Sequence, residues 1–369
     1  MEVARCLLLV RPWVLETFLP LLGVHHVLDQ APSRSCCRDH GSHRLRCHAV
    51  TSTDRRARES EPFSFPPLQV VLLGTAAGGG FPQWNCWCPV CRVGRTNPGR
   101  AHSRSQSSAA ISADGERWFL LNASPDVREQ LACLPGPLPT GIRHVPVEGI
   151  VTTDAELDHT LGLVLLREAR ALQLYATASV RDILERYSNI LPVTGAFAEV
   201  TVTETCLQRR SELRYRDGTF SGIAVTPFPV PADPPRFAPN AGPGHTVGLI
   251  VEDEMTGGRM AFVPGCGELD SELMAQLQDT DLLLFDGTFW SDDELVTLGI
   301  SERRAREMDH LPIWGKGGSL SWLSSLERPQ TVYTHINNTN PILLEDSSER
   351  AEVEQRGLKV GSDGMSFSI

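Results

Sequence analysis

The segment from Asp154 to His159 places the strongest constraint on how this chain can fold. It holds four ionisable side chains within six residues, directly after the apolar run 149–153. Burying these groups without a cation would be costly. Asp158 and His159 are adjacent, so both can bind one metal ion only from a turn between a strand and a helix. The alternative is a solvated helix start, because acidic residues are favourable near a helix N-terminus. We favour the metal site.

Apolar runs and amphipathic segments alternate along the chain from residue 68 onward. We predict strands at residues 69–74, 118–122, 149–153, 246–251, 259–263, 282–285 and 332–334. We predict a helix N-terminus at residues 124–126, and helices at residues 161–172, 271–278, 301–308, 319–325 and 347–356. Strands that alternate with helices and carry polar motifs at their ends are typical of a layered α/β domain.

Three cysteines, Cys86, Cys88 and Cys91, form a C-x-C-x-x-C pattern. Three thiolates on one short loop can occupy three corners of a tetrahedron, which suits Zn²⁺. Buried cysteines without a metal are the alternative. Because all ligands would be protein atoms, we predict a closed, structural zinc site. Candidates for the fourth ligand are Asn338, His335 and His102.

Composition narrows the class of protein. The formal net charge of −11 over 369 residues argues against a nucleic-acid-binding protein, which would normally carry a basic surface. No run of about twenty apolar residues is present, so we expect no membrane span. The chain has ten cysteines, three of them at metal-ligand spacing, which favours a reducing, cytoplasmic compartment over a disulfide framework.

The composition changes near residue 67. Residues 31–62 are rich in Arg, Ser, His and Cys and show no hydrophobic period, so we expect disorder there. The short apolar run 6–10 is followed by no typical signal-peptide cleavage site. We predict a folded domain over 68–369 and a disordered or mis-annotated extension over 1–67, with translation beginning near Leu68. A genuine extension or targeting peptide is the alternative.

The acid–histidine segment resembles the H-x-H-x-D-H signature of the metallo-β-lactamase superfamily. Asp154 and Glu156 stand where its first two histidines belong, whereas Asp158 and His159 keep the second half. The predicted strand 332–334 leads into His335, as in the last metal-binding motif of that superfamily. The resemblance implies an αββα sandwich, in which two mixed β-sheets are flanked by helices.

One departure from the superfamily limits the number of metal ions. Gly265 lies where the superfamily carries an aspartate that bridges two metals, so we expect no dinuclear hydrolase site. Asp158, His159 and His335 remain, and two histidines with one carboxylate are the ligand set of the facial triad of non-haem Fe(II) oxygenases. A mononuclear zinc site stays open, because histidine is also a common zinc ligand.

Longer motifs resemble the pyrroloquinoline quinone (PQQ) synthesis protein B family. The resemblance runs from about Leu68 to Ile369, and members of that family begin at about the position of Leu68. It is carried by residues 75–86, 106–108, 122–126, 158–160, 166–168, 286–290, 307–311, 335–341 and 363–366.

This resemblance implies a role in building the redox cofactor PQQ from a Glu and a Tyr of a precursor peptide. We expect Fe(II)/O₂-dependent hydroxylation of the tyrosine ring of the Glu–Tyr-derived precursor. The alternatives are a carrier that takes part in transport of PQQ or its precursor to the periplasm, and a mononuclear zinc hydrolase. The expected cofactors are a structural Zn²⁺ and an active-site Fe²⁺. Expected partners are the precursor and other PQQ-pathway proteins, with a homodimer as one further option.

Three residues are assigned to catalysis. His310 follows a predicted helix where related hydrolases keep a proton-donating histidine, so the resemblance gives it an acid/base role. Its alternative is an ordinary surface or core histidine. Asp154 and Glu156 would orient the metal ligands or handle protons. Nominal candidates for binding the carboxylates of the substrate are Arg95, Arg100 and Arg104.

Overall fold

A computed structural model describes residues 66–137, 139 and 141–369. The predictions made for residues 1–65 lie outside the described residues. Residues 61–369 cluster as one unit, and everything below concerns the described part of it.

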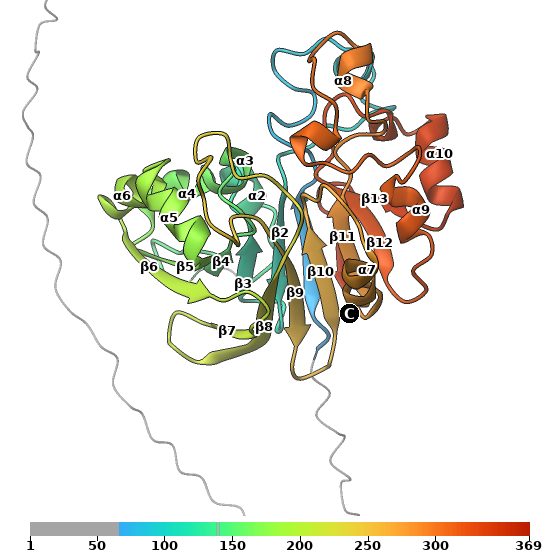
Figure 1. The fold of residues 1–369 in the computed structure, drawn as a ribbon. Helices are drawn as coiled ribbons and strands as arrows, with labels where there is room; N and C mark the ends of the chain where they lie inside the picture. Colours follow the sequence, from blue (N-terminus) through green and yellow to red (C-terminus); the bar gives the residue numbers. More distant parts are fainter. Residues whose placement is uncertain (1–65, 138, 140) are drawn as a thin grey trace, which may run out of the picture. The chain divides into compact units, whose positions relative to one another are not determined.

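The described residues form two mixed, seven-stranded β-sheets (Figure 1). In the first sheet the strand order is β14-β1-β2-β3-β4-β5-β6. Pairing is antiparallel from β14 to β3 and parallel from β3 to β6. Its strands are β1 (Gln69–Gly74), β2 (Ser108–Ser112), β3 (Trp118–Leu121), β4 (Val147–Val151), β5 (Ala171–Thr177), β6 (Glu199–Thr205) and β14 (Ser366–Ser368).

The second sheet repeats this plan in the order β13-β12-β11-β10-β9-β8-β7. Pairing is parallel from β13 to β10 and antiparallel from β10 to β7. Its strands are β7 (Ser211–Arg214), β8 (Phe220–Pro229), β9 (Val247–Asp253), β10 (Arg259–Val263), β11 (Leu282–Asp286), β12 (Gln330–Thr334) and β13 (Lys359–Val360).

Helices cover the sheet faces that point away from the sandwich. Those on the side of the first sheet are α2 (Val127–Leu131), α3 (Leu157–Thr160), α4 (Gly162–Leu165), α5 (Ala178–Arg186) and α6 (Ile190–Gly195) (Figure 1). Those on the side of the second sheet are α7 (Ser271–Gln278), α9 (Ser319–Leu323) and α10 (Ser348–Gln355) (Figure 1). The remaining elements are α1 (Pro89–Thr96), α8 (Glu294–Thr297), η1 (Leu166–Glu168), η2 (Arg306–Met308) and η3 (Pro341–Leu343).

Three apolar layers hold these elements together. The central layer lies between the sheets, where fully buried side chains such as Phe119, Tyr175 and Phe262 pack against one another. The other two layers lie between each sheet and its helices. This is the predicted αββα sandwich, with its site-bearing loops at one end of both sheets.

Two helix predictions are wrong. The segment predicted as one helix over 161–172 forms α4 and η1, and β5 then begins at Ala171, because this part of the chain pairs in parallel with β6. The helix predicted over 301–308 is reduced to η2. Its preceding backbone is anchored instead by a hydrogen bond from Ala305 N–H to the carbonyl of Asp292. The other predicted strands and helices are present, with ends shifted by a few residues at most.

Nowhere in the described part of the chain is a helix both long and apolar enough to cross a lipid bilayer.

Candidate metal centre

Strand ends from both sheets meet at the predicted metal site. The segment after β4 leads to Asp154, β11 ends at Asp286, and His335 directly follows β12. The two sheets are joined here by a parallel backbone bridge between Ala76 and Ile336. This bridge fixes the ends of β1 and β12 relative to each other, so ligands 177 positions apart in the sequence can meet.

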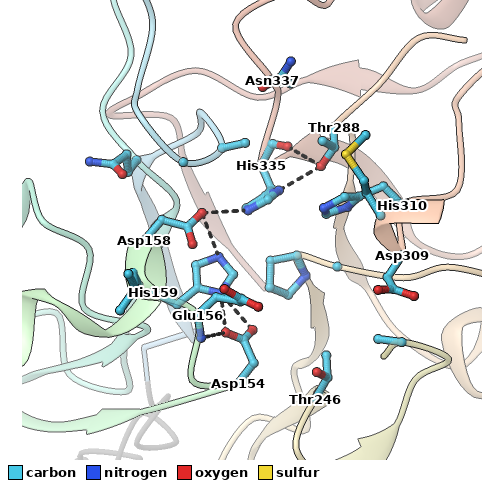
Figure 2. Close-up of a pocket in the computed structure, with 18 of the residues that line it drawn as sticks. Asp154, Glu156, Asp158, His159, Thr246, Thr288, Asp309, His310, His335 and Asn337 are labelled. Carbon is cyan, nitrogen blue, oxygen red and sulfur yellow. Dashed lines mark hydrogen bonds and ion pairs between the residues drawn. The ribbon is translucent and has the colours of Figure 1, made fainter. Parts of the chain in front are cut away.

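Asp154 holds the first histidine of the site in one orientation. Its carboxylate accepts from the Thr153 hydroxyl (2.7 Å), from Glu156 N–H (2.9 Å) and from Nδ1 of His159 (2.8 Å). In the neutral imidazole that would bind a metal ion, Nδ1 acts as the donor and Nε2 of His159 is the unprotonated nitrogen. Figure 2 shows Asp154 below His159, on the side away from Asp158. Asp154 therefore orients His159 from the side away from the predicted metal position.

His335 is oriented in the same way by the second sheet. Thr288 donates its hydroxyl hydrogen to Asp286 (2.5 Å) and receives one from Nδ1 of His335 (2.8 Å). Nε2 of His335 then points towards Oδ2 of Asp158, 3.3 Å away (Figure 2). The backbone of His335 is left-handed, with φ of 53°, which is uncommon outside glycine and clusters at functional sites.

The donor atoms fit one metal ion. Asp158, His159 and His335 offer three ligand atoms within 4.8 Å of one another. Nε2 of His159 is buried and has no hydrogen-bond partner among the described residues. A buried polar atom without a partner is costly, and a metal ion would satisfy it. Two imidazoles, held at Nδ1 by Asp154 and Thr288, and the carboxylate of Asp158 form a ready ligand set.

The charges at the site also favour a bound cation. Burial lowers the pKa of His159, but the carboxylates of Asp154 and Asp158 outweigh it and raise the pKa to about 9. A proton on His159 thus takes the place of a cation. Burial raises the pKa of Glu156 to about 7, with further contributions from Asp154 and Asp158. Glu156 is the nearby acid able to exchange a proton close to neutral pH.

His310 packs against His335, as His159 does. Nδ1 of His310 contacts Oδ2 of Asp286 at 2.7 Å, and the rings of His310 and His335 stack with centroids 5.4 Å apart. Burial lowers the pKa of His310, whereas Asp286 raises it, so that the net shift is upward. Nε2 of His310 is left to face the cavity, and Gly265, also at the cavity wall, carries no carboxylate.

The site opens into a cavity of about 710 Å³. Its wall combines the polar centre with apolar side chains, namely Leu157, Leu161, Phe237, Phe289 and Met308. A pocket of this size, mainly apolar with a few convergent polar groups, is typical of a small-molecule site.

Cys86, Cys88 and Cys91 form a second cluster, separate from the one around Asp158, His159 and His335. Sulfur atoms of Cys86, Cys88 and Cys91 lie within 4.8 Å of one another. The Cys88 thiol lowers the pKa of Cys91 to about 5 by hydrogen bonding, and its own pKa rises in turn. Asn338 faces the cluster, with its amide nitrogen 3.2 Å from the sulfur of Cys91.

Of the three fourth-ligand candidates, Asn338 alone reaches the sulfur atoms. His335 belongs to the other cluster, and His102 is exposed. Rotating the Asn338 amide by 180° would turn its oxygen towards the sulfurs, and the two orientations differ only in the assignment of N and O.

Comparison with known proteins shows to which family the chain belongs. A family model described as beta-lactamase superfamily domain matches residues 117–336. Coenzyme PQQ synthesis protein B of Methylobacterium nodulans is 40% identical over 309 residues, which is 82% of this chain and all of that protein. The Pseudomonas putida (strain GB-1) protein of the same name is 43% identical over 316 residues, again with its full length covered. The chain belongs to the coenzyme PQQ synthesis protein B family.

Solved structures agree with this assignment. The 1.98 Å crystal structure of Zn²⁺-bound PqqB from Methylobacterium extorquens superimposes with a TM-score of 0.73 at 37% identity, over 82% of this chain and all of that chain. A diphosphatase of the PhnP family reaches a TM-score of 0.56 at 20% identity, which shows the shared fold alone. The predicted resemblance and the predicted fold are both confirmed.

A role for Asp286 at this PQQ synthesis protein B site was not predicted from the sequence. Asp286 is fully buried and contacts both His310 and Thr288, and through Thr288 it reaches His335. A signal was available, because Asp286 ends an apolar strand and begins the family motif at 286–290. The structure brings the predicted residues Asp154, Glu156, Asp158, His159, His310 and His335 into one cavity wall.

Proposed function

We propose that this member of the family hydroxylates the tyrosine-derived ring of the Glu–Tyr precursor during PQQ synthesis, in a reaction that requires Fe(II) and O₂. The observation that carries the proposal is the partnerless, buried Nε2 of His159 beside Asp158 and His335. Three ligands leave open coordination positions, which O₂ chemistry requires and a purely structural site does not.

The residues of the site have different roles in this proposal, according to their positions. Asp158, His159 and His335 would hold the iron, which supplies the activation of O₂ when it is bound. Asp154 and Thr288 keep the two imidazoles in the tautomer that presents Nε2 to the metal. The apolar cavity wall binds the aromatic ring and limits access of water to the reacting carbon.

His310 is placed to move a proton. Its Nδ1 is held by Asp286, so Nε2 faces the cavity and can accept the proton of a phenol bound there. Asp286 stabilises the imidazolium that results, because the two groups are 2.7 Å apart and Asp286 is completely buried. Glu156 supplies a second proton-exchanging group on the other side of the triad.

We further propose that Cys86, Cys88 and Cys91 bind a structural zinc, with Asn338 as the fourth ligand. A relative crystallised with bound Zn²⁺ supports the presence of zinc in this family. The thiolate character of Cys91 suits the role, since metal binding requires deprotonated sulfur.

Oxygen-dependent turnover tests the proposal. Purified chain would be loaded anaerobically with Fe(II), given ascorbate as reductant and the cross-linked Glu–Tyr precursor, and followed by O₂ uptake and product mass. We expect a product heavier by oxygen, with ¹⁸O from ¹⁸O₂ incorporated into it. Turnover with Zn²⁺ in the absence of O₂ would support a hydrolase. Stoichiometric binding of PQQ without any turnover would support a carrier.

A further inference from the structure

Two guanidinium groups, from Arg236 and Arg303, lie on the wall of the catalytic cavity. Arg236 comes from the long connection between β8 and β9, and Arg303 from the connection between α8 and η2. Among the described residues that line this cavity they are the only Lys or Arg side chains. They are 67 positions apart in the sequence and line the same cavity.

The charge of Arg236 opposes the rise in the pKa of Glu156, but no hydrogen bond or close ion pair holds either guanidinium among the described residues. By contrast, the three arginines proposed from the sequence are all committed elsewhere. Arg95 donates to the carbonyls of Gln83 and Cys86, Arg100 pairs with Asp346, and Arg104 is buried against Thr75 and Gly361. That prediction is therefore wrong.

Because the cavity wall also carries several acidic side chains, the charges of Arg236 and Arg303 determine whether an anionic ligand can bind. The acidic side chains are Asp154, Glu156, Asp158, Asp233 and Asp309. Such a wall repels an anionic ligand, except where a bound metal ion would neutralise the negative charge of the wall. Arg236 and Arg303 are the groups able to attract one, and a guanidinium binds a carboxylate with two parallel hydrogen bonds.

We infer that Arg236 and Arg303 bind two carboxylates of the ligand while the apolar wall holds an aromatic body between them. The cavity thus selects a planar aromatic compound that carries at least two carboxylates. This inference rests on the proposed function only in assigning the ligand to PQQ synthesis. The side chains of Phe237 and Phe289, on the same cavity wall, supply the surface against which such a ring packs.

A pair of matched probes tests the inference without turnover. PQQ carries three carboxylates, and its trimethyl ester has the same ring system without the charges. Binding of each would be measured by isothermal titration to the full chain and to Arg236→Gln and Arg303→Gln. We expect each substitution to weaken PQQ binding about 10-fold or more, since a charge-assisted pair to a buried ligand is lost. Ester binding should stay within about twofold.

Controls separate this result from loss of folding and from failure of the proposed reaction. Arg170→Gln and Arg209→Gln remove exposed arginines that lie outside the cavity, and both should bind PQQ as the unchanged chain does. Thermal melting would verify that all four variants fold. Unchanged PQQ affinity in both cavity variants, or no binding of PQQ to the unchanged chain at all, would overturn the inference.

The outcome is independent of hydroxylation. If the chain proves to be a carrier, the affinity losses are still expected and the inference stands. If it turns over the precursor, Arg236→Gln and Arg303→Gln should raise KM about 10-fold and leave kcat within about threefold. An unchanged KM would remove the two arginines from substrate binding while leaving the hydroxylase proposal intact.

Discussion

Nε2 of His335 lies 3.3 Å from Oδ2 of Asp158, although the two residues are 177 positions apart and follow strands of different sheets. Each partner is fixed from behind, His335 by Thr288 and Asp158 by its place at the start of α3. The contact therefore joins the two halves of the sandwich at the point where the proposed metal ligands meet.

Removal of one ligand should empty the active site and spare the other metal. In His335→Ala we expect iron to fall from about one per chain to below 0.1, and zinc to stay at one. Metal content would be measured by inductively coupled plasma mass spectrometry after anaerobic loading. His245→Ala, in a half-buried loop histidine outside the cavity wall, serves as the matched control. Full iron retention in His335→Ala would contradict the triad.

The cysteine cluster should affect folding more than binding of the active-site metal. Cys91→Ser replaces a buried sulfur of the proposed zinc site, so zinc should be lost and the melting temperature should fall by roughly 5–10 °C. Cys133→Ser changes an exposed cysteine and should leave both quantities unchanged. A Cys91→Ser protein with normal zinc content and Tm would show that the cluster is not a metal site.

Asp286 should control the protonation of His310. Asp286→Asn keeps the shape but removes the charge that raises the pKa of His310, so that pKa falls. We expect kcat to drop about 100-fold, and the acidic limb of its pH profile to move to lower pH. Asp233→Asn, a cavity residue that makes no hydrogen bond to the imidazole of His310 and is not among the charges that raise its pKa, should shift neither. An unmoved pH limb in Asp286→Asn would exclude His310 as the titrating group.

Glu294 should make stability depend on pH. Burial raises its pKa to about 7 from an ordinary 4.5, so between these values the folded chain holds a proton that the unfolded chain releases. Its contribution is therefore most favourable below pH 4.5 and decreases as pH rises to 7, by on the order of 3 kcal/mol.

Glu294→Gln can keep the contacts with Trp290 N–H and the Thr339 hydroxyl without the charge. Urea unfolding at pH 5, 6, 7 and 8 should show a flatter profile for this variant, and greater stability than the unchanged chain at pH 8. Glu302→Gln alters an exposed residue and should reproduce the original profile. A parallel profile for Glu294→Gln would refute the assignment.

Gly265 should accept the carboxylate that the superfamily places there. A Cβ at this position would meet nothing closer than Cε1 of His310, at 4.0 Å, so aspartate fits without displacing backbone. In Gly265→Asp loaded with Zn²⁺ we expect one metal ion more per chain than in the unchanged protein. Equal metal content in the two proteins would show that the missing aspartate does not limit this site to one ion.

The parts of the site that could be predicted from the sequence were those marked by local patterns. The three cysteines lie within six residues, and Asp158 and His159 are adjacent, so spacing alone indicated metal binding. His335 was predictable because it follows an apolar strand. The helix over 161–172 was predicted wrongly because an apolar run of this kind suits a buried strand as well, and pairing with β6 decides between them.

Residues whose roles depend on long-range packing could not be predicted from the sequence. Asp286 acquires its role only when β11 pairs with β12 and sets its carboxylate beside Thr288 and His310. Arg236 and Arg303 come from irregular connections without hydrophobic periodicity. Nothing in their local sequence shows that they reach the cavity wall.

The segment 335–338 contributes to both clusters, with His335 at one end and Asn338 at the other. Two binding events that order the same four residues share one conformational equilibrium, and such coupling is reciprocal in binding free energy. Zinc at the cysteines would then strengthen iron binding by the same factor by which iron strengthens zinc binding. If both proposed metal ions bind, a shortage of zinc would also weaken the binding of iron.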